Sequence, residues 1–223
     1  MIRSEIRETL RNENPEVTDR VITDTVLNDW MLRADKEICA ITRCIVSNTS
    51  QTFTASTTLQ YYDLEAEITN FYDIDDLPGG GVYYNNVPLK KATPAEMNLT
   101  RRKWKTASAG TPKKWWRRGK YLWFDKVADT ANEIAVDAIL VSNDFDADAK
   151  SPYNSLSHLV PYHDGILKYL QWRVKQKIGK PDEAKIAKDD YMAYTKWMKS
   201  EVAGYNNAAI LMRPRRAQYS PEI

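Results

Sequence analysis

The chain contains few of the residues that build catalytic and metal sites, with two cysteines and two histidines among 223 residues. Cys39 and Cys44 are five positions apart in a segment expected to be helical. This spacing points their side chains in different directions, so we expect neither a disulfide nor a metal pair. His163 and Asp164 could form a base held by a carboxylate, but they stand at an expected helix start, where Asp164 more simply favours the helix dipole. Since no GxSxG or HExxH motif occurs either, the sequence predicts no enzyme, no cofactor and no metal site.

Long apolar runs and an excess of one charge are also missing. No apolar stretch approaches the roughly 20 residues that span a bilayer, and the first residues lack the apolar core of a signal peptide. We therefore expect no membrane partner. Lysine and arginine number 32 against 30 aspartates and glutamates, and the net charge of +2 gives no global preference for nucleic acid. Gly79–Gly81 lacks the lysine and hydroxyl residues of a phosphate-binding loop, so we interpret it as an ordinary loop.

Apolar residues with helical spacing are present at both ends of the chain. They predict a helix over 2–12 and a second over about 18–43, with Thr18 as the N-cap of the second. Two more helices are expected near the C-terminal end, with Gly179 closing the first and Pro181 opening the next.

The middle of the chain predicts strands. Residues 47–59 are rich in threonine and serine and carry no charge, and 133–141 partly alternates apolar and charged residues. Asn85-Asn86 and Arg118-Gly119 indicate two turns. Thr93-Pro94-Ala95-Glu96 predicts the start of a short helix, because it has a capping residue, a proline at the first helical position and a glutamate three residues after the cap.

These elements together predict an α+β fold, in which N- and C-terminal helices form a four-helix-type bundle that carries a β-rich insert and an extended C-terminal tail. The expected boundaries are 1–44 for the first helices, 45–143 for the insert, 144–157 for an acidic linker, 158–203 for the second helix pair and 204–223 for the tail.

Opposite charges are segregated within the insert. Nine basic residues and no acid lie between positions 101 and 120, interleaved with tryptophans; they are Arg101, Arg102, Lys103, Lys105, Lys113, Lys114, Arg117, Arg118 and Lys120. The acidic stretch that follows this basic run ends at Asp144, Asp146 and Asp148. Such a run can pair with acids of the next copy in an oligomer, or it can attract DNA along a channel. We favour pairing between copies, and a solvated face balanced within the chain stays a third interpretation.

The last segment loses its helical periodicity after Gly204. Its candidate docking residues are Ile210, Leu211, Met212, Arg213, Arg215 and Arg216. Pro214 disfavours a helix here, so we expect an extended peptide that adds to the groove or sheet edge of a neighbour. The alternative is a disordered terminus.

Four places in the sequence carry a family resemblance. They are Leu27–Trp30 with Tyr62–Leu64, Val82–Leu89 leading into Thr93–Glu96, Gly110–Lys113 followed by Arg118–Lys120, and Leu159–Asp164 opening a helix pair with the turn Gly179–Asp182 and a late Tyr191. In this order, over residues 18–200, the chain resembles phage head-to-tail adaptor proteins of the tail accessory factor type and ring proteins of related short-tailed phages.

The resemblance implies a structural protein of the virion neck, assembled in the host cytoplasm. It implies a closed homo-oligomeric ring of about twelve subunits that docks on the portal protein and continues the DNA channel to a downstream tail or neck protein. It implies no catalysis, and the basic run allows non-specific contact with packaged DNA. Three alternatives remain open: a lower neck or collar ring, a DNA-binding protein that uses the basic run, and a tail-associated hydrolase with a carboxylate pair.

Overall fold

The computed structural model describes residues 1–47, 50–75, 81–100 and 108–212, and it confirms the α+β class. The chain divides into two compact units. Unit 1 contains Met1–Ile45 together with the described chain from Val141 onward, and unit 2 contains the described residues from Val46 to Leu140.

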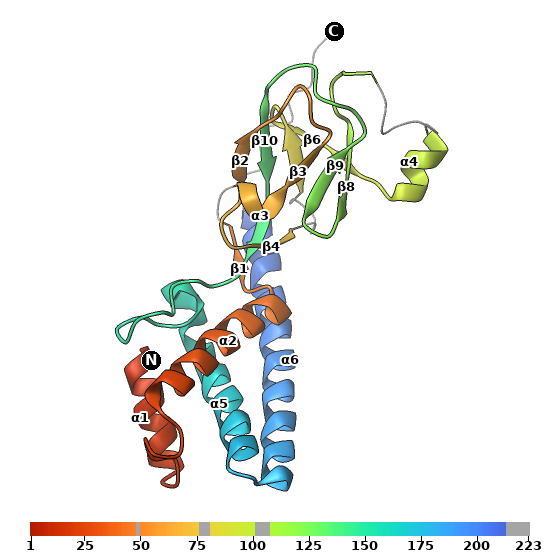
Figure 1. Cartoon of the computed structure of the whole chain (residues 1–223). Coiled ribbons are helices and arrows are strands. Elements are labelled where there is room, and N and C mark those ends of the chain that lie inside the picture. The colour runs from red at the N-terminus through yellow and green to blue at the C-terminus, as the bar shows by residue number, and fades with distance from the viewer. Residues whose placement is uncertain (48–49, 76–80, 101–107, 213–223) are drawn as a thin grey trace. The chain divides into compact units, whose positions relative to one another are not determined.

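Unit 1 is built from helices at both ends of the chain. They are α1 (Arg3–Glu13), α2 (Asp24–Thr42), the 3-10 helices η2 (Tyr153–Ser155) and η3 (Ser157–Tyr162), α5 (Asp164–Lys177) and α6 (Pro181–Met212). Both α1 and α2 pack against α5, and α2 also packs against α6. Figure 1 shows α5 beside the first half of α6. The tight turn between them contains Gly179 at a φ of +77°, which only glycine adopts without strain.

Many apolar residues of these helices are buried at helical spacing. Fully buried members are Ile6, Leu10, Ile38, Ile166, Leu170, Val174, Tyr191 and Met198. Because they come from four helices, the core of unit 1 joins segments from both ends of the sequence.

The start of α2 differs from the predicted helix over 18–43. Thr23, not Thr18, is the N-cap, and the preceding residues form a turn in which Ile22 N–H donates to the Thr18 carbonyl. The prediction is therefore wrong at its first residues. Val21, Ile22 and Thr23 are consecutive β-branched residues, which lose side-chain freedom in a helix.

The end of α6 also differs from the prediction. The helix continues to Met212, so the extended tail predicted from residue 204 is wrong over 204–212. This part of the sequence contains Ala203, Ala208 and Ala209, whose helix propensity outweighs the cost of about 1 kcal/mol for Gly204. Of the predicted docking residues, Ile210, Leu211 and Met212 lie in α6, whereas Arg213, Arg215 and Arg216 fall outside the described residues.

Unit 2 contains short strands in three sheets. The strands are β1 (Ile45–Val46, which starts at the last residue of unit 1), β2 (Gln51–Thr54), β3 (Tyr61–Asp63), β4 (Phe71–Ile74), β5 (Val82–Tyr84), β6 (Val87–Pro88), β7 (Lys90–Lys91), β8 (Lys114–Arg118), β9 (Tyr121–Phe124), β10 (Glu133–Val136) and β11 (Ala138–Leu140). The sheet orders are β1-β11-β4, β2-β10-β5-β6 and β3-β9-β8-β7. Two short helices, α3 (Leu64–Glu67) and α4 (Pro94–Thr100), interrupt the strands.

The turn and capping signals in this unit are confirmed. Asn85 and Asn86 have φ values of +48° and +63° between β5 and β6, and Gly119 has +59° between β8 and β9. At α4, Thr93 N–H donates to Glu96 Oε2 (2.6 Å), and Glu96 N–H donates to Thr93 Oγ1 (3.2 Å). Local sequence therefore determines these turns.

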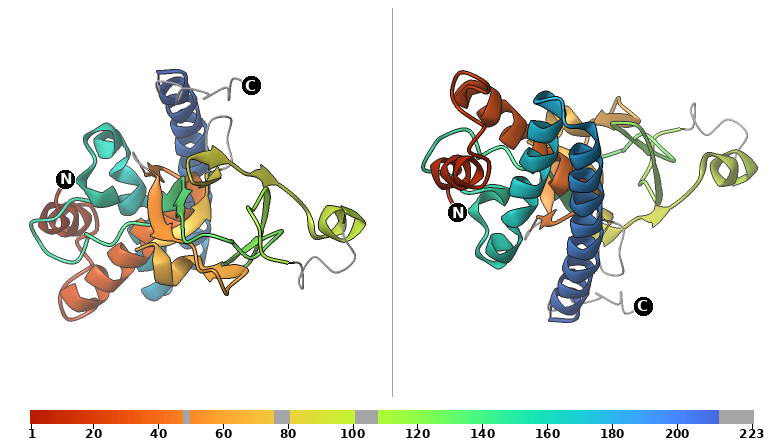
Figure 2. Two further views of the ribbon diagram at one scale, coloured as in Figure 1. Left: turned by 90° about the horizontal axis from the view of Figure 1, so that it is seen from above. Right: turned by 90° about the horizontal axis from the view of Figure 1, so that it is seen from below.

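The two neighbouring tryptophans of β8 face opposite sides of their sheet. Trp115 belongs to the main core of unit 2 with Leu122, whereas Trp116 packs with Met97 of α4 and with Trp123. Figures 1 and 2 show α4 on the side of the β8–β9 hairpin away from β10. The hairpin thus has one face on the main core and another partly covered by α4.

Candidate functional site

The structure places the described half of the basic run on one hairpin. Lys113, Lys114, Arg117, Arg118 and Lys120 lie just before β8, on β8 and in its turn to β9. Arg101, Arg102, Lys103 and Lys105 lie outside the described residues.

Two cations of this hairpin are neutralised within unit 2. Arg117 forms an ion pair with Asp73, and its Nη2 donates to the Tyr72 carbonyl at 3.0 Å. Lys120 Nζ lies 2.6 Å from Asp63 Oδ2, and this carboxylate raises the pKa of Lys120. Lys113 and Arg118 are exposed, and their side chains form no ion pair with the described residues. Neutralisation within the chain therefore accounts for part of the run.

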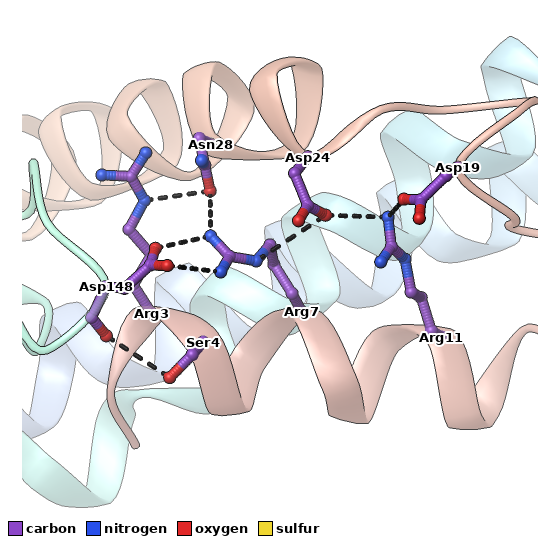
Figure 3. Close-up of polar contacts among 8 residues, drawn as sticks. All are labelled: Arg3, Ser4, Arg7, Arg11, Asp19, Asp24, Asn28 and Asp148. Carbon is purple, nitrogen blue, oxygen red and sulfur yellow. Dashed lines mark hydrogen bonds and ion pairs between the residues drawn. The ribbon is translucent and has the colours of Figure 1, made fainter.

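The predicted acidic counterpart is also partly occupied. Arg7 of α1 donates to both carboxylate oxygens of Asp148, at 2.7 and 2.8 Å, and to Asn28 Oδ1 of α2 at 2.7 Å (Figure 3). Arg3 Nε donates to the same Asn28 oxygen at 3.0 Å. The Asp148 carbonyl accepts from Ser4 N–H at 3.3 Å. The Arg7 hydrogen bond lowers the pKa of Asp148.

The same network continues along α1. Arg11 Nη2 lies 2.8 Å from Asp24 Oδ1 and also pairs with Asp19, while Arg7 Nε lies 3.8 Å from Asp24 (Figure 3). These contacts join α1 to the beginning of α2 and to the acidic segment. Asp148 is therefore a structural partner of Arg7 within one chain.

The acidic segment 144–157 packs into unit 1 through some of its side chains. Phe145 and Tyr153 are fully buried, and the Lys150 carbonyl accepts from Arg3 N–H at 2.9 Å. Asp144 is half-buried, while Asp146 is exposed and forms no ion pair with the described residues. Of the three predicted acids, Asp146 remains the most accessible to another molecule.

A buried carboxylate near this segment was not predicted. Asp35 of α2 is 1% exposed and accepts a hydrogen bond from Tyr153 N–H at 2.9 Å. Burial raises the pKa of Asp35 to about 6. One feature of the sequence could have indicated this buried carboxylate: Asp35 follows Ala34 of the apolar face of α2, where an acid needs a buried partner.

His163 has the structural surroundings expected from the sequence. It is 3% exposed, and the Met1 amino group donates to its Nδ1 at 2.7 Å. Burial, together with the positive charge of that amino group, lowers the pKa of His163 to about 4. The ring is therefore neutral at physiological pH.

The two cysteines are closer than the sequence predicted. Cys39 and Cys44 are buried free thiols whose Sγ atoms lie 3.8 Å apart. The prediction that they point apart is wrong, because α2 ends at Thr42 and Arg43 adopts a left-handed conformation, with a φ of +55°, that returns the chain over the last turn. Burial raises the pKa of the Cys39 thiol well above its usual value.

Among the described residues, no group of three or more His, Cys, Asp or Glu side chains is arranged to hold a metal ion. No helix in the described part of the chain has the length and apolar character needed to cross a membrane. Comparison with known protein families and with curated proteins finds no match for this chain.

Proposed function

We propose that this chain is the subunit of a head-to-tail adaptor ring in the neck of a tailed phage. In this proposal α1, α2, α5 and α6 form a four-helix bundle, and unit 2 is the β-rich insert carried by it. The ring docks on the portal and extends the DNA channel towards the tail. The chain performs no reaction in this role.

The observation that carries the proposal is the match between the resemblance segments and discrete elements. Tyr62–Leu64 spans the end of β3 and the start of α3, and Val82–Leu89 contains β5, an Asn-Asn turn and β6. Thr93–Glu96 caps α4, and Gly179–Asp182 connects α5 and α6. The sequence segments that suggest the family are therefore the same segments that determine local structure, in the same order.

The charge pattern supports ion pairs between neighbouring subunits, made by the exposed charges only. Arg117, Lys120 and Asp148 have partners within their own unit, so they contribute little to a neighbour. The exposed cations Lys113 and Arg118 and the exposed anion Asp146 suit contacts between copies. A single exposed ion pair contributes only about 0–1 kcal/mol, so the alignment of neighbouring subunits requires several such pairs around a ring.

Portal attachment is assigned to the end of the chain. Ile210, Leu211 and Met212 at the end of α6 precede three arginines and Pro214 in the sequence. A short apolar and basic segment of this kind suits docking on a preformed groove or sheet edge.

The experiment is co-sedimentation of the purified chain with assembled portal from the phage that encodes it. We expect the chain to be mostly monomeric alone and to sediment with portal. A variant truncated after Met212 should keep the melting temperature of the full chain but stay in the supernatant. A full-length chain that never associates with assembled portal would contradict the proposal.

A further inference from the structure

The outer face of the β3-β9-β8 sheet in unit 2 carries a row of aromatic rings. Residues opposite each other in antiparallel strands share a face, and here Tyr61 is opposite Trp123, which is opposite Trp116. The Tyr61 ring centroid lies 4.8 Å from that of Trp123 and 5.7 Å from that of Tyr121. Trp123 and Trp116 stack at 6.0 Å. We call Tyr61, Tyr121, Trp123 and Trp116 the aromatic row.

One end of the aromatic row is covered and the other is open. Trp116, only 8% exposed, packs with Met97 of α4. Tyr61 and Tyr121 are 42% and 37% exposed. Their rings are held in place by each other and by Trp123, so a planar group can contact them at little cost in side-chain ordering.

One exposed cation lies at the open end, and a second lies at the far edge of the same sheet. Arg118 is exposed and directly opposite Tyr121 in the β8–β9 pair, and Lys120 Nζ lies 5.4 Å from the Tyr121 ring centroid. Lys90 is exposed at the edge of the sheet, opposite Lys114 in the parallel β7–β8 pair.

Three carboxylates near these cations, Asp63, Asp125 and Glu96, have partners within the unit, whereas Glu65, whose charge acts on Lys120, is exposed. Asp63 pairs with Lys120, and Asp125 Oδ1 accepts the backbone N–H groups of Lys113 and Lys114 at 2.9 and 3.0 Å. Arg118 thus adds an exposed positive charge beside the two exposed rings, and Lys90 adds another at the far edge of the same face.

We propose that this face binds a single strand of nucleic acid. Bases stack on Tyr61 and Tyr121, while Arg118 contacts the phosphates beside them. A single strand is favoured over a duplex, because in a duplex the base faces are stacked on neighbouring base pairs and cannot contact the tyrosine rings. The inference concerns the chain outside the ring, where Arg118 is not engaged by a neighbouring copy, and it does not depend on portal docking.

The test is fluorescence anisotropy of a labelled oligothymidylate of about 20 nucleotides, longer than the site of a single strand-binding fold, titrated with the full chain at low salt. Tyr61→Ala and Tyr121→Ala should each weaken binding at least about fivefold. Tyr61→Phe keeps the stacking face and should bind like the unchanged chain. Tyr72→Ala is the matched control, because Tyr72 is 40% exposed on β4 outside the aromatic row.

The cations are tested separately. Arg118→Gln should weaken binding and reduce the slope of log affinity against log salt by about 0.7. Lys199→Gln, at an exposed position on α6 of unit 1, is the charge control and should change neither. Thermal melting of each variant checks that the fold is intact.

Three results would overturn the proposal. The first is no binding of the oligonucleotide by the folded chain at low salt. The second is binding that is unchanged in both Tyr61→Ala and Tyr121→Ala. The same holds if a duplex binds as tightly as the single strand and loses affinity equally in these variants. The third is loss of subunit association in the tyrosine variants with no oligonucleotide bound at all, which would assign the face to a protein partner.

Discussion

Replacing Asp35 by asparagine should stabilise the protein at neutral pH. Asp35 is 1% exposed, and burial raises its pKa from the usual 3.8 to about 6. The amide side chain would keep an oxygen that accepts the Tyr153 N–H bond, now 2.9 Å long, and would remove the buried charge. Lys36 and Asp144 act on the same carboxylate from a distance with opposite signs.

The sign and size of the effect follow from linkage. A carboxyl whose pKa is higher in the folded state than in the unfolded state binds its proton more tightly when folded. Its contribution is therefore most favourable below pH 3.8, declines as pH rises to about 6, and stays at its lowest value above that. At about 1.4 kcal/mol per pKa unit, the full change is about 3 kcal/mol.

The assay is urea unfolding of the two proteins at several pH values from about 3 to about 8, a range that contains the titration. The stability difference between Asp35→Asn and the unchanged chain should move in favour of the variant by about 3 kcal/mol across this range. Other titrating groups cancel, because both proteins contain them. Asp146→Asn, at an exposed position, is the control. A difference that does not vary with pH would refute the assignment of Asp35 as a buried acid with a raised pKa.

Three further outcomes are expected. Arg7→Gln should lower the free energy of unfolding by roughly 1–2 kcal/mol, because the Arg7 side chain, 11% exposed, donates to Asn28 and Asp148. Urea unfolding should show a larger loss of stability for this variant than for Asp148→Asn, and the reverse order would contradict the network. Gly179→Ala should cost about 1–2 kcal/mol, because an alanine at a φ of +77° is strained; an unchanged melting temperature would argue against this turn. Cys39 and Cys44 are buried, so they should react with a thiol-specific disulfide reagent only slowly without denaturant and rapidly in it, whereas fast labelling of the native chain would show that the thiols are accessible.

The elements that the sequence predicted well are those determined by neighbouring residues. The Asn85-Asn86 turn, the Thr93–Glu96 cap and the Gly119 hairpin turn each depend on the backbone preferences of a few consecutive residues. Trp115 and Trp116 are consecutive residues of β8, so strand geometry alone places one in the main core and the other on the opposite face.

The elements that it predicted poorly depend on helix ends and on distant contacts. The first helical residue of α2 and the last of α6 result from small competing propensities, which a periodic pattern does not resolve. The closeness of Cys39 and Cys44 depends on one left-handed residue at the end of a helix.

Charge pairing was the least predictable part of the candidate site. Arg7 and Asp148 are separated by 141 positions in the sequence, and Arg117 and Asp73 by 44. Composition shows only that opposite charges are segregated, and either partner could equally have belonged to another copy. Their assignment within one chain required the fold.

The most direct test of the adaptor proposal is native mass spectrometry of the chain mixed with assembled portal from the same phage. We expect one added ring of about twelve chains per portal, and monomers when portal is left out. Portal that remains without added chains at saturating concentration would contradict the central claim.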